Sequence, residues 1–512
     1  MAATGQGAMI AAMKIFVALF MLVCSAAAAD LTGRWVATET TPNGQKRETT
    51  VALIADGGSL KGFIANPRST MLIVDGRVDG DNVSFTIMRE SSGVEKRVDC
   101  TAVVSSDGLK VTIPNDNNRP PTVFTANRAS TDRPAMPAPK ISLSNDFPPV
   151  KYNGLAKTPP LGWNSWNKFH RNVDDKAVRG MADAIVSNGM KDAGYVYVNI
   201  DDTWEGTRDA SGVLQSNEKF PDMKALADYI HSKGLKIGIY SSPGPKTCAG
   251  YEGSFGHEEQ DAKTWAAWGF DYLKYDWCSA SQVYDVKSLP AVYAKMGEAL
   301  LKSGRPIVYS LCQYGWQDVG EWGAKVGGNS WRTTGDISDR WPSMMHIGFE
   351  LQPGREKYAT VGHWNDPDML EIGNGGMTDD EYRTHMSLWS ILAAPLLAGN
   401  DLRDMRKEIF DILTNREVVA IDQDAKGVQG VRVAKDGDKE VWEKPLHDGS
   451  HAVGLFNLGK DSAMVTANFS DLKLTGSHAV RDLWAHADKG KVKVKFEATV
   501  PSHGVVLVKI AK

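Results

Sequence analysis

A short stretch in the middle of the chain places charge where a buried strand should carry none. It reads Asp271-Tyr272-Leu273-Lys274-Tyr275-Asp276-Trp277-Cys278. Alternate side chains of a strand share a face, so Lys274 and Asp276 are expected to point the same way. A buried carboxylate needs a partner, and Lys274 supplies a positive charge beside Asp276. The pattern favours an ionised carboxylate that could act as a nucleophile, and a structural ion pair at a strand end is the alternative.

Strand and helix patterns alternate through residues 155–410 and must position these two charges. Strands are predicted at 161–166, 195–201, 236–240, 272–276, 307–311, 331–334, 361–364 and 387–391, with helices at 175–188, 223–233, 258–268 and 289–303. Eight strands with intervening helices in about 250 residues are typical of a (β/α)8 TIM barrel. A doubly wound open sheet is the alternative, but it would normally show a Gly-rich nucleotide loop after its first strand, and the sequence has none there.

Polar and aromatic residues collect where these strands end, and in such a barrel those ends form the site. The residues are Trp166, Asp201, Asp202, Tyr240, Lys274, Asp276, Cys312, Gln313, Arg332, Asp336 and Asp368. A single Asp at a strand end is usually a helix cap, but Asp at four ends, with Trp at several, is not explained by capping. Only His363 lies nearby, which argues against zinc, and the charges of Lys274 and Arg332 compete with Ca²⁺ or Mg²⁺. We therefore expect neither a metal nor a cofactor.

Clustered carboxylates and aromatic faces suit a sugar, and glycosidic cleavage needs two carboxyl groups flanking the scissile bond. Four segments resemble those of glycoside hydrolase family 27, which holds α-galactosidases (melibiases) and α-N-acetylgalactosaminidases. They are Gly162-Trp163-Asn164-Ser165-Trp166, Asn199-Ile200-Asp201-Asp202, Tyr272-Leu273-Lys274-Tyr275-Asp276-Trp277-Cys278 and Gly362-His363-Trp364-Asn365-Asp366-Pro367-Asp368-Met369. The resemblance covers residues 155–410 closely and the C-terminal region loosely, and it does not reach residues 30–128.

The resemblance implies a retaining, metal-free exo-glycosidase that removes terminal α-D-galactosyl residues from oligo- or polysaccharides. By motif, Asp276 matches the nucleophile and Asp336 the acid/base, with Asp339 as a rival whose other interpretation is a helix cap. Cys248 and Cys278 match a disulfide beside the pocket. Sugar-contacting or pocket-wall positions are matched by Trp166, Asp201, Asp202, Tyr240, Lys274, Cys312, Gln313, Arg332 and Asp368.

The stretch Cys312-Gln313-Tyr314 departs from the Cys-Glu-Trp that is usual in the family. It would line the 2-position of the sugar, where Gln313 sits and where a bulky Trp316 would crowd an N-acetyl group. The alternatives are therefore an α-N-acetylgalactosaminidase or a β-L-arabinopyranosidase on the same scaffold, and, more remotely, a non-catalytic carbohydrate-binding protein.

The remaining regions predict an exported multidomain protein. Residues 1–29 read as a signal peptide, 30–128 as a small all-β accessory or docking domain, 129–150 as a Pro-rich semi-rigid linker, 151–412 as the catalytic barrel and 413–512 as an antiparallel β-sandwich. A net charge of −4 gives no reason to expect a nucleic acid partner. Beyond the signal, apolar runs stay below 18 residues, so no membrane span is expected. The expected partner is a galactose-containing glycan, and the expected location is secreted or periplasmic.

Overall fold

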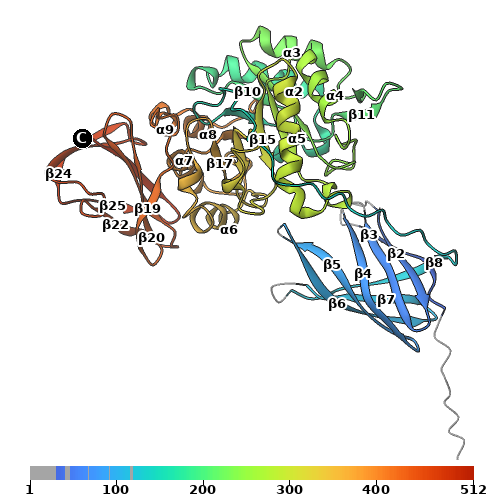
Figure 1. Cartoon of the computed structure of the whole chain (residues 1–512). Coiled ribbons are helices and arrows are strands. Elements are labelled where there is room, and N and C mark those ends of the chain that lie inside the picture. The colour runs from blue at the N-terminus through green and yellow to red at the C-terminus, as the bar shows by residue number, and fades with distance from the viewer. Residues whose placement is uncertain (1–29, 41–45, 67–68, 92, 116–118) are drawn as a thin grey trace, which may run out of the picture.

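The computed structural model describes residues 30–512 except 41–45, 67–68, 92 and 116–118. The predicted signal peptide lies outside the described residues. The chain forms an all-β region, a central barrel of strands and helices, and a second all-β region (Figure 1). The predicted fold class is confirmed. Within the described residues, no helix combines the length and the apolar content needed to cross a membrane.

The N-terminal region is a closed antiparallel β-barrel in which sequence neighbours pair and β1 closes the sheet against β8. Its strands are β1 (Gly33–Thr40), β2 (Lys46–Asp56), β3 (Ser59–Asn66), β4 (Ser69–Asp79), β5 (Asn82–Ser91), β6 (Val94–Ser105), β7 (Gly108–Ile113) and β8 (Thr122–Ser130). Alternate side chains point inward and build a core of its own around Trp35, Phe85 and Ile87.

The linker that follows is bound along the surface of the central barrel over much of its length. The Ile141 amide donates to the Val283 carbonyl at 2.7 Å, and the Asp285 amide donates back to the Ile141 carbonyl at 2.9 Å. The Asn145 side chain donates to the Lys287 carbonyl at 2.8 Å. These hydrogen bonds hold the linker, expected to be a semi-rigid spacer, against the surface of the central barrel.

The central region is a parallel barrel whose strands run in the spatial order β17-β16-β15-β14-β13-β10-β9-β18. These strands are β9 (Leu161–Asn164), β10 (Tyr197–Asn199), β13 (Lys236–Ser241), β14 (Tyr272–Asp276), β15 (Val308–Cys312), β16 (Ser330–Arg332), β17 (Trp364–Asp366) and β18 (Leu396–Ala398). Leu370 closes the ring beyond β17, because its amide donates to Leu397 and its carbonyl accepts from Gly399, both at 2.9 Å. A short hairpin, β11 (Glu205–Arg208) and β12 (Leu214–Ser216), projects from the ring.

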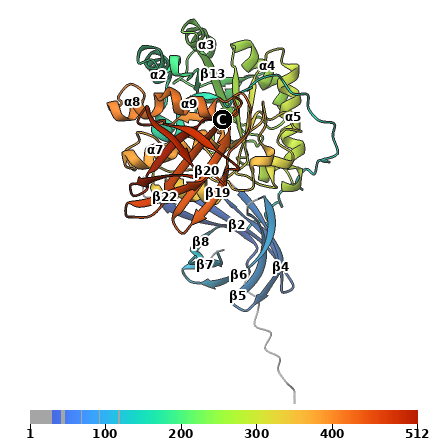
Figure 2. The same ribbon diagram turned by 90° about the vertical axis from the view of Figure 1, so that its left-hand side faces the viewer.

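The helices cover the outside of this ring (Figures 1 and 2). They are α1 (Trp166–Phe169), α2 (Asp175–Ser187), α3 (Met223–Ser232), α4 (Glu258–Trp268), α5 (Leu289–Lys302), α6 (Trp341–Met345), α7 (Asp379–Leu392), α8 (Lys407–Thr414) and α9 (Arg416–Asp422). The four predicted helices begin at the predicted residues and end within one residue of the prediction. Side-chain caps explain the sharp starts of α2 and α3, where Asp174 and Asp222 accept from backbone amides.

One predicted strand is wrong. Residues 387–391 lie inside α7, and the eighth strand is β18. Thr378 and Glu381 form a capping box that starts the helix ahead of this apolar run. The run is buried on all sides, and such a segment shows neither helical nor strand periodicity, so length and caps must decide.

The C-terminal region is a β-sandwich with a six-stranded sheet opposite the pair β22 and β25. Its strands are β19 (Val431–Asp436), β20 (Lys439–Pro445), β21 (His451–Asn457), β22 (Ala463–Asn468), β23 (Ser477–Asp482), β24 (Ala487–Lys493), β25 (Lys495–Val500) and β26 (Val505–Ile510). Strands β24 and β25 follow each other with a single residue between them. Val494 lies between them with φ 72°, a left-handed conformation that breaks the strand.

Candidate active site

A cavity of about 370 Å³ opens at the C-terminal ends of the barrel strands. Its wall includes Trp166, Asp201, Asp202, Tyr240, Lys274, Asp276, Arg332, Asp336 and Asp368, together with Cys248. Strands β9, β10, β13, β14, β16 and β17, or the residues just beyond them, deliver these side chains. The size suits one small polar ligand, and the fold thus gathers residues that are up to 202 positions apart in the sequence, from Trp166 to Asp368.

Asp276 ends β14 at the floor of this cavity, with 6% of its surface exposed. The Tyr240 hydroxyl donates to its Oδ2 at 3.2 Å, and the Tyr314 hydroxyl donates to its Oδ1 at 2.7 Å. Burial raises the pKa of Asp276 to about 6, against the opposing effects of the Lys274 charge and the Tyr314 hydrogen bond. Above that pH the carboxylate is ionised and held by two donors.

Lys274 does not pair directly with Asp276 as the strand alternation predicts. Its Nζ lies 2.8 Å from Oδ2 of Asp201, which also accepts from Asn164 at 2.9 Å. Asp201 follows β10, two strands away across β13, and its carboxylate lies closer to the ammonium group than the one on the same strand. Lys274 therefore anchors Asp201 and stabilises the charge of Asp276 through space.

Asp336 lies shortly after β16, two strands along the ring from β14, and its side chain is 71% exposed. Nη2 of Arg332 donates to Asp336 Oδ1 at 3.0 Å and lies 3.0 Å from Asp368 Oδ2. The guanidinium group thus orients both carboxylates. Asp276 and Asp336 line the same cavity, one buried and one at the rim.

Asp339, the rival candidate for the acid/base role, also lines the cavity. It does not cap a helix, since the N-cap of α6 is Arg340. Both of its carboxylate oxygens accept from the Tyr382 hydroxyl at 3.0 Å, and burial raises its pKa. Its carboxylate is therefore tied to α7, which carries Tyr382.

Asp202 lines the cavity and is anchored to the loop after β13. Its Oδ2 accepts from the Ala249 amide at 2.7 Å, whereas its Oδ1 is closed off by surrounding atoms and has no hydrogen-bond partner among the described residues. Burial raises its pKa to about 6. The Ala249 bond therefore holds this carboxylate in place at the cavity wall.

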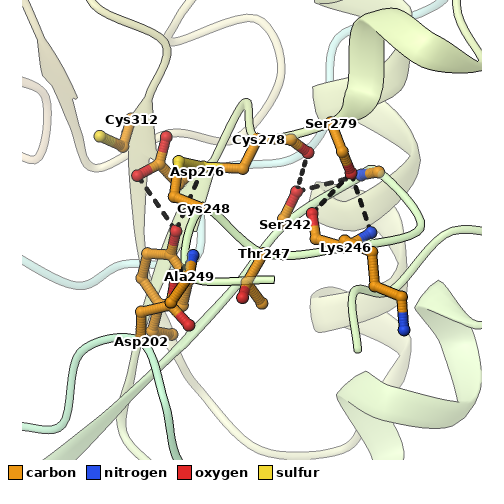
Figure 3. Close-up of a disulfide and its surroundings, with 12 residues drawn as sticks. Asp202, Ser242, Lys246, Thr247, Cys248, Ala249, Asp276, Cys278, Ser279 and Cys312 are labelled. Carbon is orange, nitrogen blue, oxygen red and sulfur yellow. Dashed lines mark hydrogen bonds between the residues drawn. A yellow bond between two sulfur atoms is a disulfide. The ribbon is translucent and has the colours of Figure 1, made fainter. Parts of the chain in front are cut away.

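The predicted disulfide between Cys248 and Cys278 is confirmed and lies directly beside Asp276 (Figure 3). It ties the loop after β13 to the residue two positions beyond the end of β14. The two sulfurs and the Asp276 carboxylate are close enough to resemble a metal cluster. The sulfurs are bonded to each other, however, so they offer no thiolate ligands.

Two residues expected at the sugar lie behind the cavity wall instead. Gln313 is fully buried, its amide nitrogen donates to the Arg332 carbonyl at 3.2 Å, and its Oε1 accepts from the Gly315 amide at 2.7 Å. Cys312 is 1% exposed, with its Sγ 3.7 Å from Nη1 of Arg332. Both therefore shape the loop and orient Arg332. Trp316, expected to crowd an N-acetyl group, packs against Gly93 of the N-terminal barrel.

The sequence reasoning missed Tyr314, Glu371, Asn167 and His170, all of which line the cavity. Asn167 donates to Oε1 of Glu371 at 2.7 Å, and burial raises the pKa of Glu371 to about 7. Asn167 and Glu371 directly follow recognised motifs, so continuing those motifs by a few residues would have found them. Tyr314 was visible only as a departure from the family pattern, and its contact with Asp276 depends on the loop conformation.

Comparison with known proteins matches the two C-terminal regions separately. The family model described as alpha galactosidase A matches residues 158–424, and the one described as alpha galactosidase C-terminal beta sandwich domain matches residues 436–510. This chain belongs to the α-galactosidase (melibiase) group of glycoside hydrolase family 27. An alpha-galactosidase of Cyamopsis tetragonoloba is 50% identical over 357 residues, which cover 69% of this chain and 85% of the relative.

Solved structures of the family agree with this assignment. Alpha-galactosidase I from Mortierella vinacea is 40% identical with a TM-score of 0.67, and the match covers 70% of this chain and 98% of that one. A structure from Bacteroides fragilis, 32% identical with a TM-score of 0.67, covers 94% of this chain and 92% of its own. The second match is long enough to extend into the N-terminal barrel.

Proposed function

We propose that this family 27 enzyme is an exported retaining exo-α-galactosidase, with Asp276 as nucleophile and Asp336 as acid/base. The observation that carries the assignment is the pair of carboxylates on one cavity, the first buried and held by two hydroxyls, the second at the solvent rim. A retaining mechanism needs one carboxylate to attack the anomeric carbon and another to exchange a proton with the leaving group and then with water.

In the first step, an oxygen of Asp276 bonds to the anomeric carbon while the bond to the glycosidic oxygen breaks. Asp336 gives its proton to that leaving oxygen, and its rim position gives it access to the departing alcohol. Esterification removes the charge of Asp276, which had favoured the protonated form of Asp336. In the second step Asp336 takes a proton from water as the water displaces Asp276, which releases galactose with its α-configuration retained.

The polar wall is assigned to the hydroxyl groups of the galactosyl ring. Asp201, Asp202 and Asp368 supply acceptors, Lys274 and Arg332 supply donors, and Trp166 supplies an aromatic side. All six side chains line the cavity, which supports the assignment. Export rests on the leader pattern at residues 1–29 and on the disulfide between Cys248 and Cys278, which forms in oxidising compartments.

The test is hydrolysis of p-nitrophenyl α-galactoside, with the first-formed anomer identified by NMR. Wild type should release α-galactose first, and Asp276→Asn should lower kcat by at least roughly a thousandfold. Asp228→Asn, which removes an exposed carboxylate on α3, is the control and should keep full activity. The proposal is wrong if wild type does not cleave this substrate or if Asp276→Asn remains active. Parallel assays with the N-acetylgalactosaminide and β-L-arabinopyranoside measure the preference.

A further inference from the structure

The loop that follows β15 holds an unusual backbone conformation. Tyr314 has φ 62°, Gly315 φ 79°, Gln317 φ 52° and Asp318 φ 49°. Residues other than glycine rarely adopt this left-handed backbone conformation. Each one costs roughly 1–3 kcal/mol and persists only where its surroundings impose the conformation. A loop with three strained non-glycine residues needs support from several directions.

Part of that support comes from within the central barrel. Oε1 of Gln313 accepts from the Gly315 amide at 2.7 Å and from the Trp316 amide at 3.1 Å. Further along, the Trp322 indole donates to the Gln317 carbonyl at 3.0 Å. These bonds fix both ends of the loop. The Trp316 ring packs beside Tyr314, with ring centroids 5.6 Å apart, and against the core of the central barrel.

The N-terminal barrel supplies the remaining support through Gly93, just before β6. Nε2 of Gln317 donates to the Gly93 carbonyl at 3.2 Å and to the Val286 carbonyl at 2.6 Å. A Cβ placed on Gly93 would lie 2.7 Å from the Cβ of Trp316, and Gly93 has φ 74°. Only glycine allows both this conformation and this approach.

We propose that the N-terminal barrel is a positioning element of the active site, in which Gly93 seats Trp316 and Gln317 and so keeps the Tyr314 hydroxyl on Asp276. The proposal rests on the assignment of Asp276 as nucleophile. It gives residues 30–128 a role in the reaction itself, beyond the accessory or docking role expected from the sequence. The path is short, because Tyr314 stands two residues before Trp316 and its hydroxyl lies 2.7 Å from the reacting carboxylate.

Displacing Tyr314 should change the acid side of the pH profile. Its hydroxyl lowers the pKa of Asp276, so its loss raises that pKa further and the ionised nucleophile disappears at a higher pH. The groups that act on Asp276 are Lys274 on its own strand and, from neighbouring elements, Tyr240, Tyr314, Asp336 and Asp201. Gly93→Leu replaces none of these residues. A shift of the acid limb in this variant would therefore indicate that Tyr314 has moved.

The test compares Gly93→Leu with Gly80→Leu in the full-length protein. Gly80 precedes β5 in the same barrel with φ 58°, but its side-chain direction is open space, so the backbone strain is matched without the contact. Gly93→Leu should lower kcat roughly tenfold, the scale of a lost hydrogen bond to a charged group, and move the acid limb to higher pH. Gly80→Leu should resemble wild type. In a Tyr314→Phe background, Gly93→Leu should add little, because both changes remove the same bond.

Hydrogen exchange of the 313–318 peptide gives a readout that needs no turnover. The Gly315 and Trp316 amides should exchange at least tenfold faster in Gly93→Leu and at the wild-type rate in Gly80→Leu. Equal kinetics and equal exchange in the two variants would overturn the inference, as would full additivity of Gly93→Leu with Tyr314→Phe. An inactive wild type would contradict the proposed function instead, and the exchange data would still decide whether Gly93 supports the loop.

Discussion

Two all-β regions flank the catalytic barrel, and they join it in different ways (Figures 1 and 2). The C-terminal sandwich has a core of its own between its sheets, but one face of it joins the hydrophobic core of the barrel. There Phe349 makes edge-on ring contacts with Trp442 at 6.1 Å and Phe456 at 5.1 Å. The N-terminal barrel keeps a separate core. It contacts the linker through the Lys140–Glu95 ion pair at 2.9 Å and the catalytic barrel through the Gln317–Gly93 hydrogen bond.

This difference indicates which of the two all-β regions unfolds together with the catalytic barrel. The apolar layer shared by the barrel and the sandwich is exposed if either unfolds alone, so the two should unfold cooperatively. An interface made largely of polar contacts resembles those between independent domains. The N-terminal barrel should therefore unfold as a unit of its own, even though its Gly93 contact lies close to Asp276.

The largest effect is expected from Phe456→Ala at the sandwich–barrel interface. Phe456 is fully buried, and such a truncation costs about 3–5 kcal/mol. Calorimetry should show the shared barrel–sandwich transition moving to lower temperature while the N-terminal transition stays in place. Met464→Ala, on the exposed face of β22, is the control. If the sandwich showed a separate transition that shifted alone, the barrel and the sandwich would not unfold as one unit.

Ile87→Ala makes the corresponding change in the core of the N-terminal barrel. Ile87 is fully buried in β5, and its truncation should cost about 2–5 kcal/mol. Only the N-terminal transition should shift, and α-galactoside hydrolysis should fall as that transition is crossed because the Gly93 contact is then lost. Val123→Ala, 46% exposed on β8, should change neither property.

A smaller effect is expected in the pH dependence of stability at the sandwich–barrel junction. At the sandwich–barrel junction, burial raises the pKa of Asp422 to about 8, and Lys444 beside it has its pKa lowered to about 8. Between pH 4 and 8 the folded Asp422 keeps a proton that the unfolded chain loses, so stability falls as pH rises. Asp422→Asn should flatten this fall, measured as denaturation midpoints at pH 5 and 7. The exposed Asp471→Asn should retain the wild-type slope.

The smallest effect is expected from Glu95→Gln at the polar interface. Glu95 and Lys140 are partly exposed, at 34% and 23% of their side chains, and such pairs contribute about 1 kcal/mol or less. The N-terminal transition should shift slightly at low salt and not at all in 1 M NaCl, where the pair is screened. A salt-independent shift of several kcal/mol would mean that this interface is more than a polar contact.

Local patterns predicted much of this molecule because they depend on neighbouring residues. Helix starts followed Asp caps, and strand-end motifs located Asp276, Asp336 and most of the cavity wall. The prediction failed at 387–391, where burial on every side hides the helical period. It also failed at Gln313, because which side of a loop faces a cavity depends on backbone angles that the residue types leave open.

By itself, the sequence determined the barrel class, the family, most of the elements and most of the carboxylates at the cavity. These follow from periodicity, caps and motif residues that act over a few positions. Only the tertiary structure decided that Lys274 pairs with Asp201, that Tyr314 donates to Asp276, and that Gly93 reaches the loop carrying Tyr314. Such contacts join residues far apart in the chain, and their geometry is fixed by how strands and domains pack against one another.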